Sequence, residues 1–137
     1  MVQLDIEYLG ELSTRIVHGA NSSELVTCAP KDHRGIAESF SPTDLLAAAL
    51  GSCILILMAV AARKSGADVT GLRASIEKEM ISTPVRRVGK MVVHVSCPRS
   101  FSFEVQQALE AAGKGCPVHH SLHPDTIQEF HFQWGHA

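Results

Sequence analysis

The sequence predicts an α+β domain built on antiparallel-rich sheets, and three observations support this prediction. Short stretches in which apolar and polar residues alternate occur towards both ends of the 137-residue chain, and this period of two is typical of half-buried strands. One long apolar segment with helix signals interrupts them at residues 42–65, and a second, amphipathic helical pattern follows at residues 102–112. The resulting order, β-β-β-α-β-β-α-β, indicates the α+β class.

Length and composition are those of an ordinary globular protein. A chain of 137 residues is expected to form one domain, spanning residues 1–137. The net charge of −2 shows no excess of either sign, so nucleic acid and acidic membrane surfaces are not expected as partners. The first residues lack a basic stretch followed by an apolar run, so no secretory signal is expected and the expected location is the cytoplasm.

The first third of the chain predicts three strands and a loop. In residues 2–8 every second residue is apolar, and residues 13–17 and 24–28 are two further strand-like stretches. The turn-rich residues 18–23 separate the second stretch from the third, which predicts a hairpin. Residues 30–39 are polar and charged and are expected to form a loop.

The long apolar segment begins with strong helix signals. Ser41 offers an N-cap hydroxyl, Pro42 suits the first helical position, and Asp44 places an acid in the first turn. The helix should end near Ser65, because Gly66 can adopt the left-handed conformation that closes a helix. The segment is long enough to raise a membrane-spanning interpretation. Its alanine content and central Gly-Ser-Cys favour instead the buried central helix of a domain or a dimer.

The second half of the chain predicts two strands, a helix and a closing strand. Strands are expected at residues 69–81 and 87–96, on either side of a turn around Pro84. Apolar residues at helical spacing predict a helix at residues 102–112. Residues 126–134 are expected to close the domain as a strand.

The four cysteines are the main candidates for chemistry. They form no CxxC pair, and cytosolic cysteines are more often reduced, metal-bound or catalytic than part of a disulfide framework. Cys53 lies too deep in the apolar helix for the helix dipole to stabilise its thiolate, so a reactive Cys53 needs a cation or hydrogen-bond donors from elsewhere. An inert core thiol is the alternative, and Cys28 and Cys97 are interpreted as structural. The candidate cations are four arginines: Arg15, Arg34, Arg86 and Arg87.

Cys116 has a different setting, directly before a proline that can open a short helical turn. A thiol at such an N-cap would face the helix dipole and could be exposed to solvent. If a peroxide converts Cys53 to a sulfenic acid, Cys116 is the natural partner for condensation to a disulfide. The apolar neighbours of Cys53 along its helix would suit a substrate with a hydrocarbon body. An ordinary loop cysteine is the alternative for Cys116.

Metal binding is a second possible chemistry in the same region. Cys116 and three histidines form a C-x2-H-H-x2-H cluster that comprises His119, His120 and His123. Thiolate and imidazole are good zinc ligands. The candidate ligands are packed more tightly than in usual structural zinc sites, and no HExxH motif is present. No metal site is therefore predicted.

Two cysteine motifs resemble those of the OsmC/Ohr family. The segment FSPTDLLAAALGSC at residues 40–53 resembles the first motif, and CPVHHSL at residues 116–122 resembles the second. The intervening PVRRV at residues 84–88 resembles a strand signature of the family. Together they span nearly the whole chain, and the chain is most similar to a general OsmC-like subgroup.

The resemblance implies a fold in which two subunits intertwine as a homodimer, with their strands wrapped around two central helices and two active sites at the interface. It also implies that Cys53 attacks the peroxide and that Cys116 resolves the product. The implied function is reduction of organic hydroperoxides in protection against oxidative stress. No bound cofactor is expected, because an external dithiol such as a lipoyl group would be the reductant.

The residues expected to support the Cys53 thiolate depart from the family pattern. The best-studied members carry a glutamate directly after the helix-start proline and an arginine in the first hairpin. This chain has Thr43 after that proline and Leu12 near the hairpin position. Possible replacements are Arg15, Arg34, Glu38 and Asp44. The alternative function is a dimeric binding protein for a small apolar ligand or a metal, without redox turnover.

Overall fold

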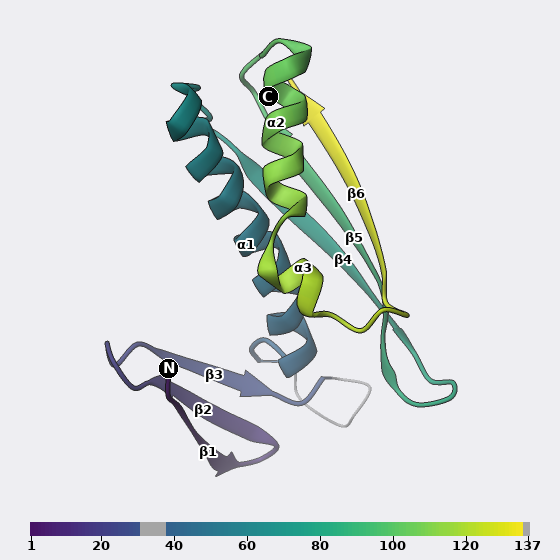
Figure 1. The fold of residues 1–137 in the computed structure, drawn as a ribbon. Helices are drawn as coiled ribbons and strands as arrows, with labels where there is room; N and C mark the ends of the chain where they lie inside the picture. Colours follow the sequence, from purple (N-terminus) through teal and green to yellow (C-terminus); the bar gives the residue numbers. More distant parts are fainter. Residues whose placement is uncertain (31–37, 136–137) are drawn as a thin grey trace. The chain divides into compact units, whose positions relative to one another are not determined.

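The structure is a computed structural model that describes residues 1–30 and 38–135, so Arg34 lies outside the described residues. Its contacts group the chain into two compact units, Met1–Leu46 and Ala47–Ala137. The α+β class with antiparallel-rich sheets is confirmed, because three of the four pairings between the described strands are antiparallel (Figure 1). The assignment of residues 1–137 to a single domain stays a prediction.

The first unit is a three-stranded antiparallel sheet in the order β1-β2-β3. Its strands are β1 (Leu4–Gly10), β2 (Ser13–His18) and β3 (Glu24–Cys28). Glu11 and Leu12 connect β1 to β2, and both have a positive φ (54° and 57°). A two-residue hairpin turn of type I′ requires this at both of its central residues. The predicted hairpin between the second and third strands is confirmed.

One face of this first sheet is apolar and uncovered. Ile6, Ile16 and Leu25 are cross-strand neighbours, and Ile6 and Leu25 are 62% and 51% exposed. The alternation in the first strand predicts half-burial, and this part of the prediction is wrong for the single chain, where residues 4–9 are all exposed. Alternation shows that one face is apolar, but it does not show what covers that face.

Helix α1 (Pro42–Ser65) has the predicted bounds. Its start is closed by a reciprocal capping box, in which the Asp44 N–H donates to Ser41 Oγ (3.1 Å) and the Ser41 N–H donates to Asp44 Oδ2 (2.9 Å). By length and composition α1 is also apolar enough to cross a membrane, with a mean hydropathy of 2.6 over its most apolar window. The core helix of a soluble protein can have the same composition. One face of α1 is buried, and its buried residues recur at helical spacing, among them Leu50, Ile54 and Met58.

The second unit contains a sheet in the order β4-β5-β6. β4 (Arg73–Ile81) pairs with β5 (Arg87–Cys97) in an antiparallel hairpin, and β6 (Ile127–Trp134) pairs with β5 in parallel. The parallel pairing is possible because a helical crossover joins the two strands. This crossover consists of α2 (Phe103–Lys114) and the short α3 (Pro117–Ser121).

The strand predicted at residues 69–81 begins four residues later than expected. A turn occupies its first residues, because the Leu72 N–H donates to the carbonyl of Val69 (2.9 Å). Gly71 in this turn has a φ of +90°, and Pro98 packs against it. The apolar residues that suggested a longer strand therefore belong to the connection that follows α1.

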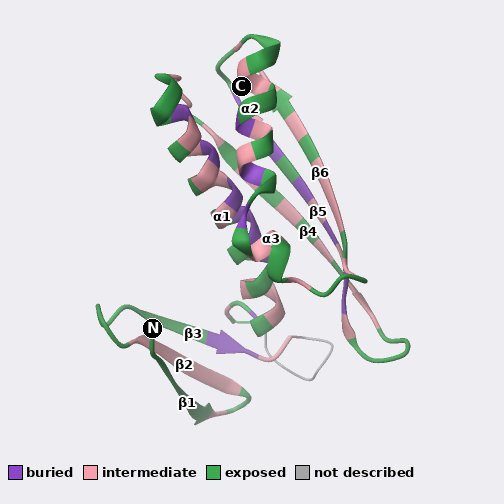
Figure 2. Cartoon of the chain, in the orientation of Figure 1, coloured by how far each residue is buried: buried purple, intermediate pink, exposed green. Residues whose placement is uncertain are grey.

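The core of the second unit lies between its helices and one face of its sheet (Figures 1 and 2). Two glycines allow close approach of the layers. A Cβ at Gly51 of α1 would lie 3.0 Å from Ile76 of β4, and a Cβ at Gly113 of α2 would lie 3.0 Å from both Ile54 and Met58. This tight packing fixes the rotation of α1 and thereby the direction in which its cysteine faces.

Candidate active site

The fold brings the thiols of Cys53 and Cys116 together. Cys53 lies half-buried on α1, Cys116 lies directly before α3, and neither forms a disulfide. The two side chains lie close enough for Cys53 to raise the pKa of the Cys116 thiol. Two cysteines from distant parts of the sequence are therefore neighbours in the fold.

Cys116 is the N-cap of α3. Its backbone is extended (φ −65°, ψ 132°), and its Sγ accepts the N–H of His119 at 3.4 Å. Pro117 occupies the first helical position, where its fixed φ suits a helix start. The His120 N–H donates to the Cys116 carbonyl at 3.2 Å. The short helix thus holds both the backbone and the sulfur of Cys116.

The expected exposure of Cys116 is wrong, because its exposed fraction is 0% and it belongs to the core cluster of the second unit. Burial raises the pKa of the Cys116 thiol, and the neighbouring Cys53 side chain raises it further. The N–H groups of His119 and Val118 oppose this rise in pKa with a smaller effect. Desolvation therefore outweighs the first-turn dipole, and Cys116 is held as a neutral thiol.

Gln128 on β6 fixes the residue that caps this sulfur. Its Nε2 donates to the His119 carbonyl at 3.0 Å, and its Oε1 accepts from His119 Nδ1 at 2.5 Å. The edge of the His119 ring packs against Phe130, with ring centroids 5.2 Å apart. Sequence reasoning missed Gln128 and Phe130. Their spacing of two along the last strand predicts that they share one face of the sheet, but it does not connect either of them to Cys116.

The histidines of the predicted C-x2-H-H-x2-H cluster have other contacts. His119 is held by Gln128, His120 lies against the His119 ring at 4.8 Å, and His123 Nδ1 accepts the Asp125 N–H at 3.0 Å. In residues 1–30 and 38–135, no three His, Cys, Asp or Glu side chains are grouped so that they could hold a metal ion.

The candidate supporting residues Arg15, Glu38 and Asp44 all lie in the first unit. Arg15 pairs with Glu7 at 2.9 Å and approaches Glu24 at 4.0 Å. Asp44 closes the capping box of α1, and Glu38 is exposed. Support of the Cys53 thiolate by any of them stays a prediction.

The two other candidate cations lie in the second unit, around the start of β5. Arg86 is exposed in the connection between β4 and β5. Arg87 is half-buried, and its Nη1 donates to the Val88 carbonyl at 3.5 Å. The positions of these two arginines do not identify the group that stabilises the Cys53 thiolate.

Residues 35–129 match the family model described as OsmC-like protein. The chain belongs to the OsmC family. A solved structure from Psychrobacter arcticus 273-4, of a protein named for osmotic stress induction and a detoxification response, is 34% identical to this family member. It superimposes with a TM-score of 0.91 over 96% of both chains. No curated protein matches the sequence.

More distant OsmC structures share the fold. An organic hydroperoxide resistance protein OsmC from Legionella pneumophila is 13% identical, with a TM-score of 0.76 over 98% of this chain and 96% of that one. An organic hydroperoxide resistance protein from Elizabethkingia anophelis is 15% identical, with a TM-score of 0.72 over 100% of this chain and 96% of that one. The predicted membership of the OsmC/Ohr family is confirmed by the family match and by the Psychrobacter arcticus structure.

The two remaining cysteines of this OsmC-like protein are buried free thiols. Cys28 at the end of β3 is 8% exposed, and Cys97 at the end of β5 is 0% exposed. The Cys97 carbonyl accepts the Gly135 N–H at 2.9 Å. Their burial agrees with the structural role expected for both.

Proposed function

We propose that this OsmC-like protein is a thiol peroxidase that reduces organic hydroperoxides through Cys53 and Cys116. The observation that carries the proposal is that the two free thiols are neighbours in the fold. Such a pair can pass from dithiol to disulfide without a large rearrangement of the chain. Family members named for organic hydroperoxide resistance support the substrate class.

The difference between the two thiols supports an order of reaction. Cys53 is half-buried, whereas Cys116 is fully buried, and its raised pKa keeps it protonated. The Cys116 S–H can then donate to the Cys53 sulfur and stabilise a thiolate there. Cys53 is therefore the attacking thiol and Cys116 the resolving thiol.

The reaction proceeds in two steps that balance. The Cys53 thiolate attacks one peroxide oxygen, the O–O bond breaks, and the leaving alkoxide takes a proton to become the alcohol. Cys53 is then a sulfenic acid. The Cys116 sulfur attacks the Cys53 sulfur, the S–O bond breaks, and water leaves with the proton that Cys116 gives up. An external dithiol such as a lipoyl group returns the disulfide to two thiols and becomes oxidised itself.

The surroundings of Cys53 favour peroxides with an apolar body. Its neighbours at helical spacing include Ala49, Leu50, Ile56 and Leu57. Apolar contacts can stabilise an alkyl or aryl group next to the sulfur, and hydrogen peroxide has no such group. The proposed substrates are therefore organic hydroperoxides.

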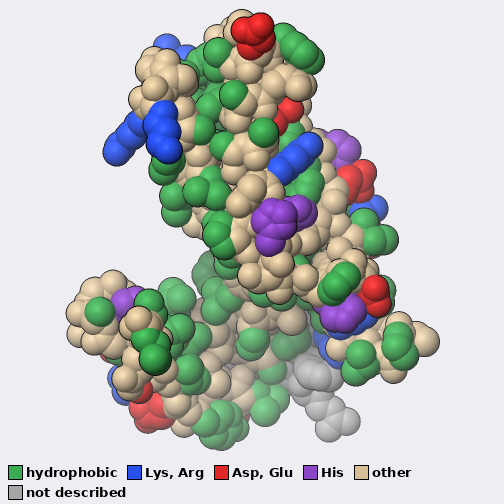
Figure 3. All heavy atoms as spheres, in the orientation of Figure 1, with side chains coloured by type: hydrophobic (Ala, Val, Ile, Leu, Met, Phe, Trp, Pro, Cys, Tyr) green, Lys and Arg blue, Asp and Glu red, His purple; other side chains and the backbone are tan. Residues whose placement is uncertain are grey.

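The proposed active form is a cytoplasmic homodimer. Ile6 and Leu25 on the first sheet are exposed, as are Ile56 (59%) and Val60 (44%) on α1. Apolar side chains also reach the surface in Figure 3. Continuous apolar faces on a strand and a helix are typical of surfaces that a second subunit covers. Light scattering of the purified protein tests this, and a monomeric mass would contradict it.

Peroxide titration with intact-mass detection tests the enzymatic proposal. One equivalent of cumene hydroperoxide should remove two hydrogens from the wild type by forming the Cys53–Cys116 disulfide. Cys53→Ser should show no such loss, and Cys116→Ser should accumulate a sulfenic acid that dimedone traps. Cys97→Ser is the matched control and should behave as the wild type. Free thiols at both positions in the treated wild type would overturn the proposal.

A further inference from the structure

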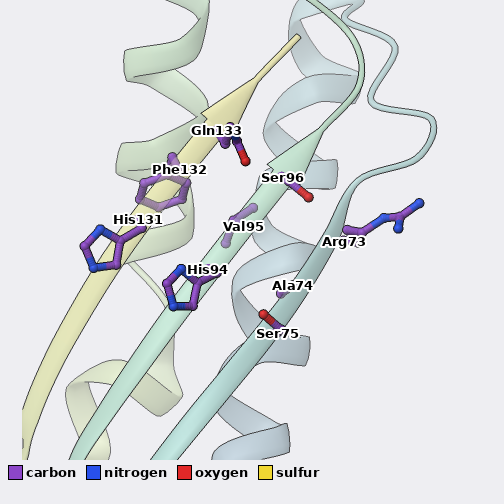
Figure 4. A pocket seen from close by; sticks show the side chains of 9 residues that line it. All are labelled: Arg73, Ala74, Ser75, His94, Val95, Ser96, His131, Phe132 and Gln133. Atoms are coloured by element: carbon purple, nitrogen blue, oxygen red, sulfur yellow. The ribbon is translucent and has the colours of Figure 1, made fainter. Parts of the chain in front are cut away.

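A polar surface lies on the outer face of the β4-β5-β6 sheet, opposite its helices (Figure 4). Inward-facing residues of this region, such as Val95 and Phe132, join the core. The residues that alternate with them along each strand point to the other face, where they line an open hollow of about 490 Å³. They form two cross-strand rows, Ser75–His94–His131 and Arg73–Ser96–Gln133.

Two imidazoles at the centre of the hollow are paired and oriented by carboxylates. The rings of His94 and His131 lie within 15° of parallel, with centroids 5.1 Å apart. Nε2 of His94 lies 3.3 Å from Glu77 Oε1, and Nε2 of His131 lies 3.1 Å from Glu129 Oε1. An ionised carboxylate only accepts hydrogen bonds, so in its bond with Glu129 the Nε2 of His131 is the donor. A protonated imidazole has a second N–H donor at Nδ1.

The other polar side chains of the hollow have unused hydrogen-bonding capacity. Arg73, Ser75, Ser96 and Gln133 make no side-chain hydrogen bond or ion pair within residues 1–30 and 38–135. They offer a guanidinium, two hydroxyls and an amide. None of the lining residues is acidic. The charge and the donors of this surface therefore suit an anion.

We propose that the hollow binds a tetrahedral oxyanion, either a free ion or the phosphate or sulfate group of a small molecule, when His94 and His131 are protonated. The imidazolium rings would supply charged donors, and Arg73 would add a guanidinium at the β4 edge, where its side chain extends outward from the strand in Figure 4. Two adjacent imidazolium ions repel each other, and the neighbouring carboxylates of Glu77 and Glu129 offset this repulsion. Binding is therefore coupled to protonation.

The charged groups around the two imidazoles determine whether anion binding strengthens or weakens as pH falls. Glu77 and Glu129 contact the rings, Arg73 lies in the next row, and Lys90 pairs with Glu129 at 3.1 Å. In general, imidazole is the side chain whose charge changes near neutral pH, whereas carboxylate, guanidinium and ammonium groups stay charged there. Lower pH should therefore strengthen anion binding.

Sulfate is the best probe, because it stays a dianion over this pH range. Titration of protein with nitrogen-labelled histidine side chains, at constant ionic strength in sodium chloride, should give saturable NMR shifts of the His94 and His131 ring nitrogens. The dissociation constant should be at least roughly tenfold larger at about pH 8 than at about pH 6. Equal affinity at both pH values, or unsaturable shifts equal to those of His18 and His123, would overturn the proposal.

Matched arginine variants distinguish sulfate binding at the hollow from a general effect of losing one positive charge. Arg73→Gln should weaken sulfate binding by roughly fivefold or more. Arg99→Gln should not, since Arg99 lies outside the lining residues and pairs with Asp68 at 3.1 Å. Equal losses in both variants would contradict the assignment. Amide spectra report whether each variant is folded. Glycerol phosphate is tested in parallel, and tighter binding than that of sulfate would identify an organic phosphate as the ligand.

Discussion

Gln128 holds His119 at two points, at the imidazole (2.5 Å) and at the main-chain carbonyl (3.0 Å). His119 in turn donates its N–H to the Cys116 sulfur. A strand that follows both cysteines in the sequence therefore determines where the second thiol lies. Gln128 acts on Cys116 through His119, so it is a positioning residue.

Gln128→Ala should slow disulfide formation more than it slows attack on the peroxide. Loss of both hydrogen bonds should lower stability by about 1 kcal/mol and release α3 from its position. The sulfenic acid on Cys53 should then persist longer, which stopped-flow kinetics with a sulfenate trap would measure. The matched control is Gln107→Ala on α2, where the side chain is exposed. Equal slowing of both steps would show that the role of Gln128 is only structural.

Stability should fall as pH rises through the range in which thiols ionise. The pKa of Cys116 is raised in the folded state by burial, so in that range the unfolded chain loses this proton first. The contribution of Cys116 is complete below the ordinary thiol pKa and is lost as pH rises toward the raised pKa of the folded state. Urea unfolding between about pH 7 and about pH 10 measures this trend. Cys116→Ala should reduce the slope, and an unchanged slope would contradict the assignment.

Gly71→Ala should destabilise the protein through two separable effects. Gly71 has a φ of +90°, and an added Cβ would lie 2.7 Å from Cγ of Pro98. Gly66 has a φ of +72° with nothing within 4 Å of an added Cβ, so Gly66→Ala isolates the conformational cost of about 1–2 kcal/mol. Thermal unfolding should show a larger loss for Gly71→Ala. Equal losses would show that the Pro98 contact relaxes without cost.

Asp44→Asn should keep both stability and peroxide reduction, since an asparagine oxygen can still accept the Ser41 N–H in the capping box. Asp44→Ala removes that acceptor and should cost about 1 kcal/mol of stability. Urea unfolding and a peroxide-consumption assay measure the two properties. A stable Asp44→Asn protein that lost peroxide reduction would assign the carboxylate charge to support of the thiolate instead.

Local signals in the sequence predicted most of the secondary structure. The capping residues Ser41 and Asp44 gave the start of α1, because a helix N-terminus is decided by its immediate neighbours. The start of β4 was missed, since the turn at Gly71 depends on contact with Pro98 from another strand end. The parallel pairing of β5 and β6 likewise depends on a distant contact that periodicity does not contain.

The candidate site was predictable only in part. The two cysteine motifs identified Cys53 and Cys116, but the burial of Cys116 follows from the packing of α3 into the core and not from its N-cap position. The contact of Gln128 with His119 joins a helical turn to a strand, and neither segment has a local signal for it. Tertiary packing therefore decides the pKa of Cys116, while local sequence decides its place along the chain.

The order of elements around α3 has a consequence for biosynthesis. Both cysteines emerge from the ribosome before β6, which must pair with β5 and supply Gln128. A growing chain therefore exposes two thiols before the strand that fixes their geometry exists, and long-range pairing of this kind forms late in folding. The geometry of the two thiols is therefore complete only when the sheet is complete.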